Sequence, residues 1–321
     1  MTVMMNDSSL RSHVIEDAVM QAAMQPWIQM ECYQLGQGKR LGQMEALDLG
    51  SQQVVRECQD AAVQKLGVMP PNLCTVSYCT PAPTFRFSEL SASDADTIFF
   101  MPEHTEFDLY VPAGAQTAYI SFNQDEFLRG AQALNPMQWE HAPEQVLSIR
   151  STQQAALKTV VNLSLQAADT INASDHSRYA DVLRDMLLLD VLQITAATDA
   201  NDMQPSSIER VRALHVCRAA RELVAERLAA GEIPTIVDIC MSVGVSERTL
   251  QYAFRSYVDM SPLAYLRLCR LNHVRAILHM ADPSVTTITD IAMRFGFVHL
   301  GRFAADYKRL FDESPSFTLA S

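Results

Sequence analysis

The stretch ITDIAMRFGFVHLGRFAADYKRLFDESP (Ile288–Pro315) decides the fold, because the chain contains a close counterpart of it. That counterpart is IVDICMSVGVSERTLQYAFRSYVDMSP (Ile236–Pro262). The two copies are offset by 52 residues at their glycines, Gly244 and Gly296, and by 53 residues at their final prolines. One residue has therefore been added in the second turn, and the self-similarity predicts a structural unit that occurs twice.

Each copy has the pattern of two short helices joined by a tight turn. In the first copy, Gly244 can adopt the left-handed conformation that ends a helix, and Ser246 can cap the next one. Leu250 and Phe254 are four residues apart and are expected to pack inward. The polar side chains between them then face outward, which is the layout of a helix-turn-helix.

The segment between the copies, SPLAYLRLCRLNHVRAILHMADP (Ser261–Pro283), predicts one longer helix. Ser261 is a cap and Pro262 suits the first helical position. About 18 helical residues extend about 27 Å at about 1.5 Å per residue. A helix of this order can hold two recognition helices near the roughly 34 Å spacing of successive major-groove faces.

The C-terminal third of the chain resembles the DNA-binding domain of the AraC/XylS transcriptional regulators. The likeness covers about 208–316 and is carried by GVSERTLQYAF, SPLAYLRLCRLNHVRAIL, ITDIAMRFGF and GRFAADYKRLFDESP. The segment HLGRFAADYKRLF makes it most similar to the branch that includes ethanolamine-utilisation regulators. One departure is Asp312, which stands where the family usually has Gly. The resemblance implies a sequence-specific regulator of bacterial promoters, with activation as the expected sign.

The resemblance also implies which side chains contact DNA. In the first unit it assigns base contacts to Arg248, Gln251 and Tyr252; Arg can pair with guanine and Gln with adenine. The outward positions of the second unit offer fewer hydrogen bonds, so we expect the first unit to carry more of the specificity. The remaining DNA-contacting candidates are Arg255, His299, Leu300, Gly301, Arg302, Lys308 and Arg309, of which Arg255, Lys308 and Arg309 are expected on phosphates.

The earlier part of the chain has a different periodicity. From Trp27 to Asn123 it contains seven short apolar runs broken by Gly, Pro, Asp or Ser, which predict strands of a small barrel or sandwich. Helical patterns follow near 143–172 and 175–197. The predicted fold class is α+β and multidomain: an N-terminal β-barrel-like, cupin-like domain with helices, and a C-terminal all-α domain with two helix-turn-helix units.

The expected domain boundaries follow from these changes of pattern. They are a flexible arm at 1–26, an effector-sensing and dimerisation domain at 27–197, a linker at 198–207 and a DNA-binding domain at 208–321, with units at about 235–256 and 287–311. In the N-terminal domain, Phe85, Phe87, Phe99 and Phe107 are candidate ligand-binding residues, although an ordinary barrel core explains the same pattern. The helices after the barrel suit a dimer interface or packing on their own domain equally well.

The charge distribution agrees with two parts that have different partners. The net charge is −12, but the chain from Asn201 onward has 14 Lys and Arg against 13 Asp and Glu. Its basic residues are almost all Arg, which suits bidentate contacts to phosphate and guanine. A sequence-neutral architectural DNA protein is disfavoured, because such proteins are strongly basic.

Two enzyme classes are the alternatives: a metal-dependent cupin and a DNA-repair methyltransferase-like protein fused to a DNA-binding module. The N-terminal His residues are scattered, and no metal site or cofactor is expected. Cys74 and Cys79 lie in strand-like runs without a basic partner nearby, which favours inert thiols and a protein that is not an enzyme.

The expected partners and location follow from the same features. Double-stranded promoter DNA is the main partner, and the resemblance adds RNA polymerase, a small-molecule effector and a second copy of the chain. No membrane association is expected, since no apolar stretch is long enough to span a bilayer. The unpaired cysteine count of seven and the N-terminal residues MTVMMNDSSLRSH, which do not resemble a signal peptide, predict a cytoplasmic protein.

Overall fold

The computed structural model describes residues 10–91, 96–170, 176–196 and 208–320. The chain divides into two compact units. The first consists of residues 1–16, 20–32 and 41–205, and the second of residues 17–19, 33–40 and 206–321. The predicted linker at 198–207 lies outside the described residues.

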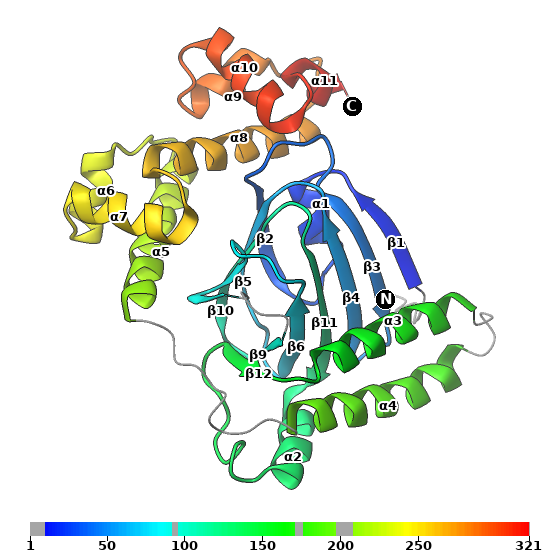
Figure 1. Ribbon diagram of the computed structural model, residues 1–321. Coiled ribbons are helices and arrows are strands. Elements are labelled where there is room, and N and C mark those ends of the chain that lie inside the picture. Colours follow the sequence, from blue (N-terminus) through cyan, green and yellow to red (C-terminus); the bar gives the residue numbers. More distant parts are fainter. Residues whose placement is uncertain (1–9, 92–95, 171–175, 197–207, 321) are drawn as a thin grey trace. The chain divides into compact units, whose positions relative to one another are not determined.

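The first unit is built on antiparallel strands (Figure 1). The strands are β1 (Leu10–Ile15), β2 (Gln29–Gln34), β3 (Gly42–Asp48), β4 (Gln53–Gln59), β5 (Val63–Val68), β6 (Leu73–Cys79), β7 (Arg86–Phe87), β8 (Leu90–Ser91), β9 (Thr97–Met101), β10 (Glu106–Val111), β11 (Gln116–Asn123) and β12 (Leu147–Arg150). All seven predicted runs contain strands. Sequence inspection missed β1, β4, β5 and β12.

The strands form two sheets instead of one continuous closed barrel. The larger has the order β1-β3-β4-β11-β6-β9-β12 and the smaller the order β2-β5-β10-β7-β8. Because successive strand residues point to opposite faces, the register fixes which residues share a face. Ser77 of β6 pairs with Tyr119 of β11 and with Phe99 of β9, so these three side chains lie on one face of the larger sheet.

The opposite face of the larger sheet packs on helices. These helices are α2 (Gln124–Leu134), α3 (Gln154–Thr170) and α4 (His176–Ala196). Val76, Ile120 and Phe100 from the sheet join Leu157 and Leu187 from the helices in one buried cluster. Asn123 caps α2 by accepting a hydrogen bond from the Glu126 N–H, as its position before the helix predicts.

Two expectations for this unit are wrong. Residues 10–26 do not form a flexible arm, because β1 pairs along its whole length with β3 and the short helix α1 (Ala18–Ala23) follows. The predicted helix at 143–172 begins only at Gln154, since Leu147–Arg150 pairs with β9 as the strand β12. Extended pairing at a sheet edge outweighs the weak helical pattern there.

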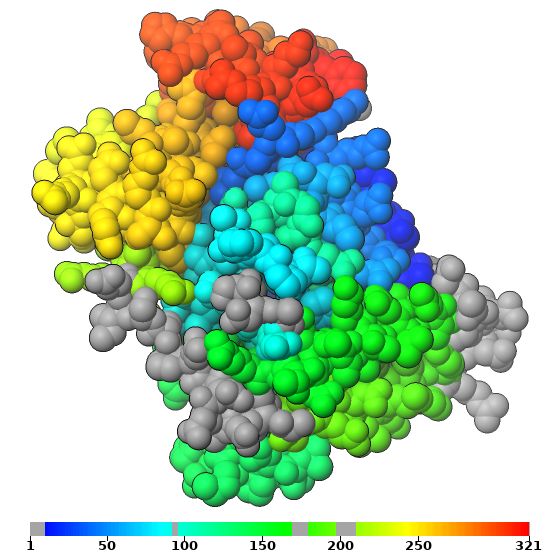
Figure 2. All heavy atoms as spheres, in the orientation of Figure 1, coloured from blue at the N-terminus to red at the C-terminus, as the bar shows by residue number. Residues whose placement is uncertain are grey.

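The second unit is helical. Its helices are α5 (Ile208–Ala229), α6 (Ile236–Val243), α7 (Glu247–Val258), α8 (Pro262–Met280), α9 (Ile288–Arg294), α10 (Leu300–Phe311) and α11 (Pro315–Ala320). α8 is the long segment between the two copies of the repeat. In Figure 2 the first copy (yellow) and the second (orange to red) form separate lobes at its two ends.

Candidate nucleic-acid interface and internal cavity

The first helix-turn-helix unit is fixed by its helix ends. The Thr235 hydroxyl accepts a hydrogen bond from the Asp238 N–H, and the Asp238 carboxylate accepts one from the Thr235 N–H at 2.8 Å. This capping box starts α6. Gly244 ends the helix with φ 72°, a left-handed conformation that costs an L-residue with a side chain more than it costs Gly. Ser246 then caps α7 by accepting from the Thr249 N–H.

These constraints set the outward face of α7. Leu250 and Phe254 are completely buried. Arg248 and Arg255 are exposed, and their guanidinium groups make no ion pair within the described part of the chain. Tyr252 is 61% exposed and Gln251 is half-buried. The predicted base-reading side chains of the first unit therefore lie on the outer side of one helix, at or near its N-terminal end.

The second unit repeats this construction. The Thr287 hydroxyl accepts from the Asp290 N–H at 3.1 Å and donates to the Asp290 carboxylate at 2.6 Å. Gly296 is left-handed, with φ 76°. The turn differs at its end, because His299 precedes α10 without a side-chain capping hydrogen bond. Because of the one-residue insertion, an exposed histidine that makes no capping hydrogen bond stands where the first unit has its serine cap.

The outward face of α10 carries the other predicted residues. Gly301 and Arg302 are exposed and Leu300 is half-buried, while Phe303 and Tyr307 face the core. Lys308 and Arg309 are exposed in the last turn, where Arg309 Nη2 lies 3.2 Å from the Asp306 carboxylate. That carboxylate also pairs with Arg267 of α8.

The repeat extends to a feature that sequence inspection did not use. The residue that follows α7, Asp259, has φ 53°, and the residue that follows α10, Asp312, has φ 55°, both in the left-handed region. The two residues are 53 positions apart, like the prolines that follow them. Asp312 therefore fits where the family usually has Gly, since Asp tolerates this conformation better than most residues.

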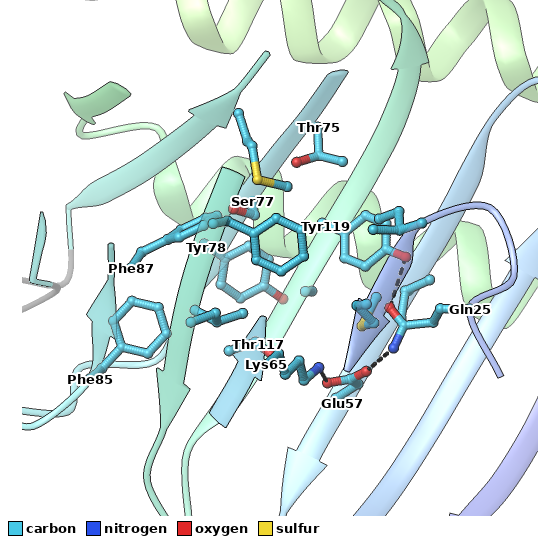
Figure 3. Close-up of a pocket in the computed structure, with 17 residues that line it drawn as sticks. Gln25, Glu57, Lys65, Thr75, Ser77, Tyr78, Phe85, Phe87, Thr117 and Tyr119 are labelled. Carbon is cyan, nitrogen blue, oxygen red and sulfur yellow. Dashed lines mark hydrogen bonds and ion pairs between the residues drawn. The ribbon is translucent and has the colours of Figure 1, made fainter. Parts of the chain in front are cut away.

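The first unit of the fold encloses a cavity between its two sheets (Figure 3). It holds about 570 Å³ outside protein atoms, which includes the part open to solvent. Phe85, Phe87 and Phe107 line it, as three of the four candidate ligand-binding residues. Phe99 does not line it directly; its ring packs 5.7 Å from that of Phe85 and 5.4 Å from that of Phe87.

The cavity also contains a charged pair that sequence inspection missed. Lys65 of β5 forms an ion pair with Glu57 of β4, and the two side chains are 5% and 2% exposed. Gln25 donates to Glu57 at 2.7 Å and accepts from the Tyr119 hydroxyl at 2.9 Å. The two charges come from strands of different sheets, so no local spacing in the sequence brings them together.

The cysteines named as alternatives are both buried. Burial raises the pKa of the Cys74 thiol well above its usual range and raises that of Cys79 to about 12. Within the described ranges there is no group of three or more His, Cys, Asp or Glu residues that could hold a metal ion. None of the helices in the same ranges is long and apolar enough to cross a membrane.

Comparison with known proteins identifies the repeat region. Residues 239–321 match a family model described as a helix-turn-helix domain. The chain is 42% identical over 82 residues to a probable thc operon regulatory protein of Rhodococcus erythropolis, covering 26% of this chain and 25% of that protein. It is 33% identical over 141 residues to an XylDLEGF operon transcriptional activator of Pseudomonas putida, covering 44% and 40%.

A solved structure also matches over more of the chain. The crystal structure of the AraC-like transcriptional activator CuxR covers 84% of this chain and 96% of its own, with a TM-score of 0.40 and 16% identity. The first two relatives are matched over less than half of their own length. The narrower likeness to ethanolamine-utilisation regulators stays a prediction. From its duplicated capped units and its matched residues, the C-terminal domain of this chain is a helix-turn-helix domain of the AraC/XylS type.

Proposed function

We propose that the whole chain is a sequence-specific transcriptional regulator that binds bacterial promoter DNA and activates transcription. The observation that carries the proposal is the duplicated helix-turn-helix, with exposed Arg and Tyr side chains and a half-buried Gln on α7, and exposed Arg and His side chains at the start of α10. An activating sign is supported by the relative from Pseudomonas putida, which is named a transcriptional activator. Activation implies contact with RNA polymerase, and the expected location is the cytoplasm, where bacterial DNA lies.

The two recognition helices have different roles in this proposal. α7 reads bases through Arg248, Gln251 and Tyr252, because side chains near the start of a recognition helix reach base edges. α10 offers Arg302 and His299 for hydrogen bonds and Leu300 for a thymine methyl, and its Gly301 lets the backbone approach DNA closely. Arg255, Lys308 and Arg309 bind phosphates, which positions the protein without reading sequence.

The first unit of the fold supplies regulation in this proposal. Its cavity is lined mostly by apolar and aromatic side chains together with a few polar groups, as small-molecule sites typically are. A small-molecule effector bound there alters DNA binding or activation. Phe85, Phe87 and Phe107 contact the ligand, and Phe99 supports their rings from behind.

A second copy of the chain is the proposed partner of α4. Val182, Met186 and Leu189 are spaced four and three residues apart and are 56%, 55% and 60% exposed. They therefore form an apolar stripe on the side of α4 opposite its buried residues Leu183 and Leu187. A stripe of this kind on an otherwise amphipathic helix favours packing against an equivalent helix.

An enzyme is the second candidate, and the geometry argues against its nucleophilic form. A reactive cysteine needs an accessible thiolate, whereas burial raises the pKa of both candidate thiols. The regulator proposal is tested by genome-wide mapping of bound sites, followed by mobility shifts with a recovered promoter and with its scrambled sequence. Equal affinities for the two DNAs would contradict it.

A further inference from the structure

The cavity in the first unit of the fold has two unlike walls. Phe85, Phe87 and Phe107 form one wall together with Leu109, all from the segments of the smaller sheet. Thr75, Ser77 and Thr117 lie on the other side, on the neighbouring strands β6 and β11 of the larger sheet (Figure 3). A ring that enters between the sheets meets phenylalanine rings on one side and, on the other, three hydroxyl groups beside the aromatic ring of Tyr119.

The hydroxyl groups on that wall are free to bind a ligand. Thr75, Ser77 and Thr117 make no side-chain hydrogen bond to any residue that the structure describes. Thr75 is only 2% exposed, and its hydroxyl has no protein partner among the described residues, so a polar atom of a ligand in the cavity can bind it.

At one end of the cavity, the negative charge of Glu57 is compensated by the positive charge of Lys65. The Glu57 carboxylate accepts hydrogen bonds from Gln25 at 2.7 Å and from Gln21 and Gln59 at 3.3 Å, in addition to its ion pair with Lys65. Glu57 is the only described acceptor for the Lys65 ammonium, which has three N–H donors. The ion pair has no net charge, and of its two side chains only Lys65 has N–H groups left that can donate to a ligand.

We propose that this cavity binds an uncharged ring compound that carries a hydrogen-bond-accepting oxygen. The ring lies against the phenylalanine wall, and the oxygen accepts from Lys65 or from the hydroxyls of Thr75 and Ser77. A carboxylate ligand would leave one net negative charge beside Glu57 in a region of low dielectric, which is costly. The regulatory meaning of the site rests on the proposed function, but ligand binding itself does not.

Three compounds of nearly the same shape test which class of ligand the cavity binds: acetophenone, benzoate and ethylbenzene. Their binding to the full chain is measured by isothermal titration calorimetry. Acetophenone is expected to bind about tenfold more tightly than either of the others, because one hydrogen bond to a charged or buried donor contributes about 1.4 kcal/mol. Equal or tighter binding of benzoate would overturn the uncharged class. Equal binding of ethylbenzene would overturn the role of the polar wall, and no binding of any compound would overturn the site.

Two sets of variants locate the oxygen, one that keeps the buried ion pair and one that replaces it with a neutral pair. The double change Thr75→Val and Ser77→Ala is expected to weaken acetophenone by about 2- to 10-fold and to leave ethylbenzene unchanged. Thr159→Val is the control, since its hydroxyl is exposed on α3 and donates to the Ala155 carbonyl. Lys65→Met with Glu57→Gln tests the charged end as a neutral pair. If neither the double change at Thr75 and Ser77 nor the double change at Lys65 and Glu57 weakens acetophenone binding relative to the parent chain, the proposal is wrong.

Promoter binding is measured in parallel without any of the compounds. A chain that binds its promoter but none of the three compounds refutes this inference and leaves the regulator proposal standing. A chain that binds acetophenone as expected but no DNA refutes the regulator proposal and leaves this inference standing.

Discussion

Arg275 of α8 and Glu313, which follows α10, form a buried ion pair, with 3.1 Å between Arg275 Nη2 and Glu313 Oε1 and side chains that are 7% and 8% exposed. The guanidinium also lies over the Phe311 ring, 4.6 Å from its centroid. Glu313 accepts a further hydrogen bond from Thr318 of α11, whose hydroxyl accepts one from Tyr307. This network joins α8, α10 and α11 into one body.

Glu313→Gln is expected to destabilise the second helix-turn-helix unit. Removing one partner of a buried ion pair leaves the other charge without compensation, which costs up to about 3–5 kcal/mol. Chemical denaturation measures the loss as a lower free energy of unfolding. Glu232→Gln is the control, because its ion pair with Arg227 is largely exposed and should contribute little to the free energy of unfolding. Equal effects of the two changes would contradict the structural role of the buried pair.

Gly296→Ala is expected to destabilise the chain more than Gly244→Ala. Both positions have positive φ, so each substitution costs about 1–2 kcal/mol in backbone strain. A Cβ at Gly296 would also lie 2.5 Å from Ile233 Cδ1 and 3.0 Å from Arg270 Nη1, whereas a Cβ at Gly244 has nothing within 4 Å. Both atoms are the ends of side chains that can move, and Ile233 is 45% exposed, so the free energies of unfolding from urea titrations should differ by only about 0.5–1.5 kcal/mol, the cost of shifting a rotamer. A larger loss at Gly244 would exclude this packing of the second turn.

Arg248→Ala is expected to weaken promoter binding by about 1–3 kcal/mol and to relax the preference at one base pair. The reason is that an exposed guanidinium in the first turn of a recognition helix can bind guanine at two positions. Mobility shifts with a panel of single-base operator variants measure the effect. A uniform loss across the panel would instead make Arg248 a phosphate contact.

Arg309→Ala is expected to weaken binding to all sequences and to reduce the slope of log affinity against log salt by up to about one unit. Arg309 lies in the last turn of α10, away from the base-reading end, and is 64% exposed at its side chain. Arg309 must give up its ion pair with Asp306 to bind a phosphate, so it contributes less to DNA affinity than an unpaired arginine would. An unchanged salt slope would argue against this role.

Leu189→Glu is expected to convert a dimer into a monomer, because it places a charge in the apolar stripe of α4. Sedimentation velocity measures the mass of the particle in solution. Met137→Glu is the matched control, since Met137 is 87% exposed outside that stripe. A parent chain that is already monomeric at micromolar concentration, or a Leu189→Glu chain that stays dimeric, would refute the proposed interface.

The C-terminal domain could be predicted closely from the sequence because its signals are local. Gly244, Ser246 and Ser261 act within one turn of their own positions, and the repeat shows two of them again, as Gly296 and Ser314. The same kind of signal was available but unused at Thr235 and Asp238, where a T-x-x-D spacing forms the capping box.

The N-terminal unit was harder to predict because its decisive contacts join strands of different sheets. The Lys65–Glu57 pair depends on how two sheets face each other, and alternation in one strand does not contain that information. α4 illustrates the same limit. Val182, Met186, Leu189 and Ile194 lie close to helical spacing, but of these only Ile194 is buried. The structure instead buries Leu183, Leu187 and Val191. Periodicity identified the helix and did not determine which side faces the core.

The continuous helix α8 sets both the distance and the rotation between the two helix-turn-helix units. Each helical residue turns the chain by about 100°, so inserting or deleting one residue in α8 would swing the second unit by that angle about the helix axis. A base pair turns DNA by about 35°, and such a change would therefore misalign the second unit by about three base pairs. Mutations can change the bases that each unit prefers one side chain at a time. No single substitution changes the distance between the two half-sites by a small step. We therefore expect the operators of related proteins to differ in sequence far more readily than in spacing.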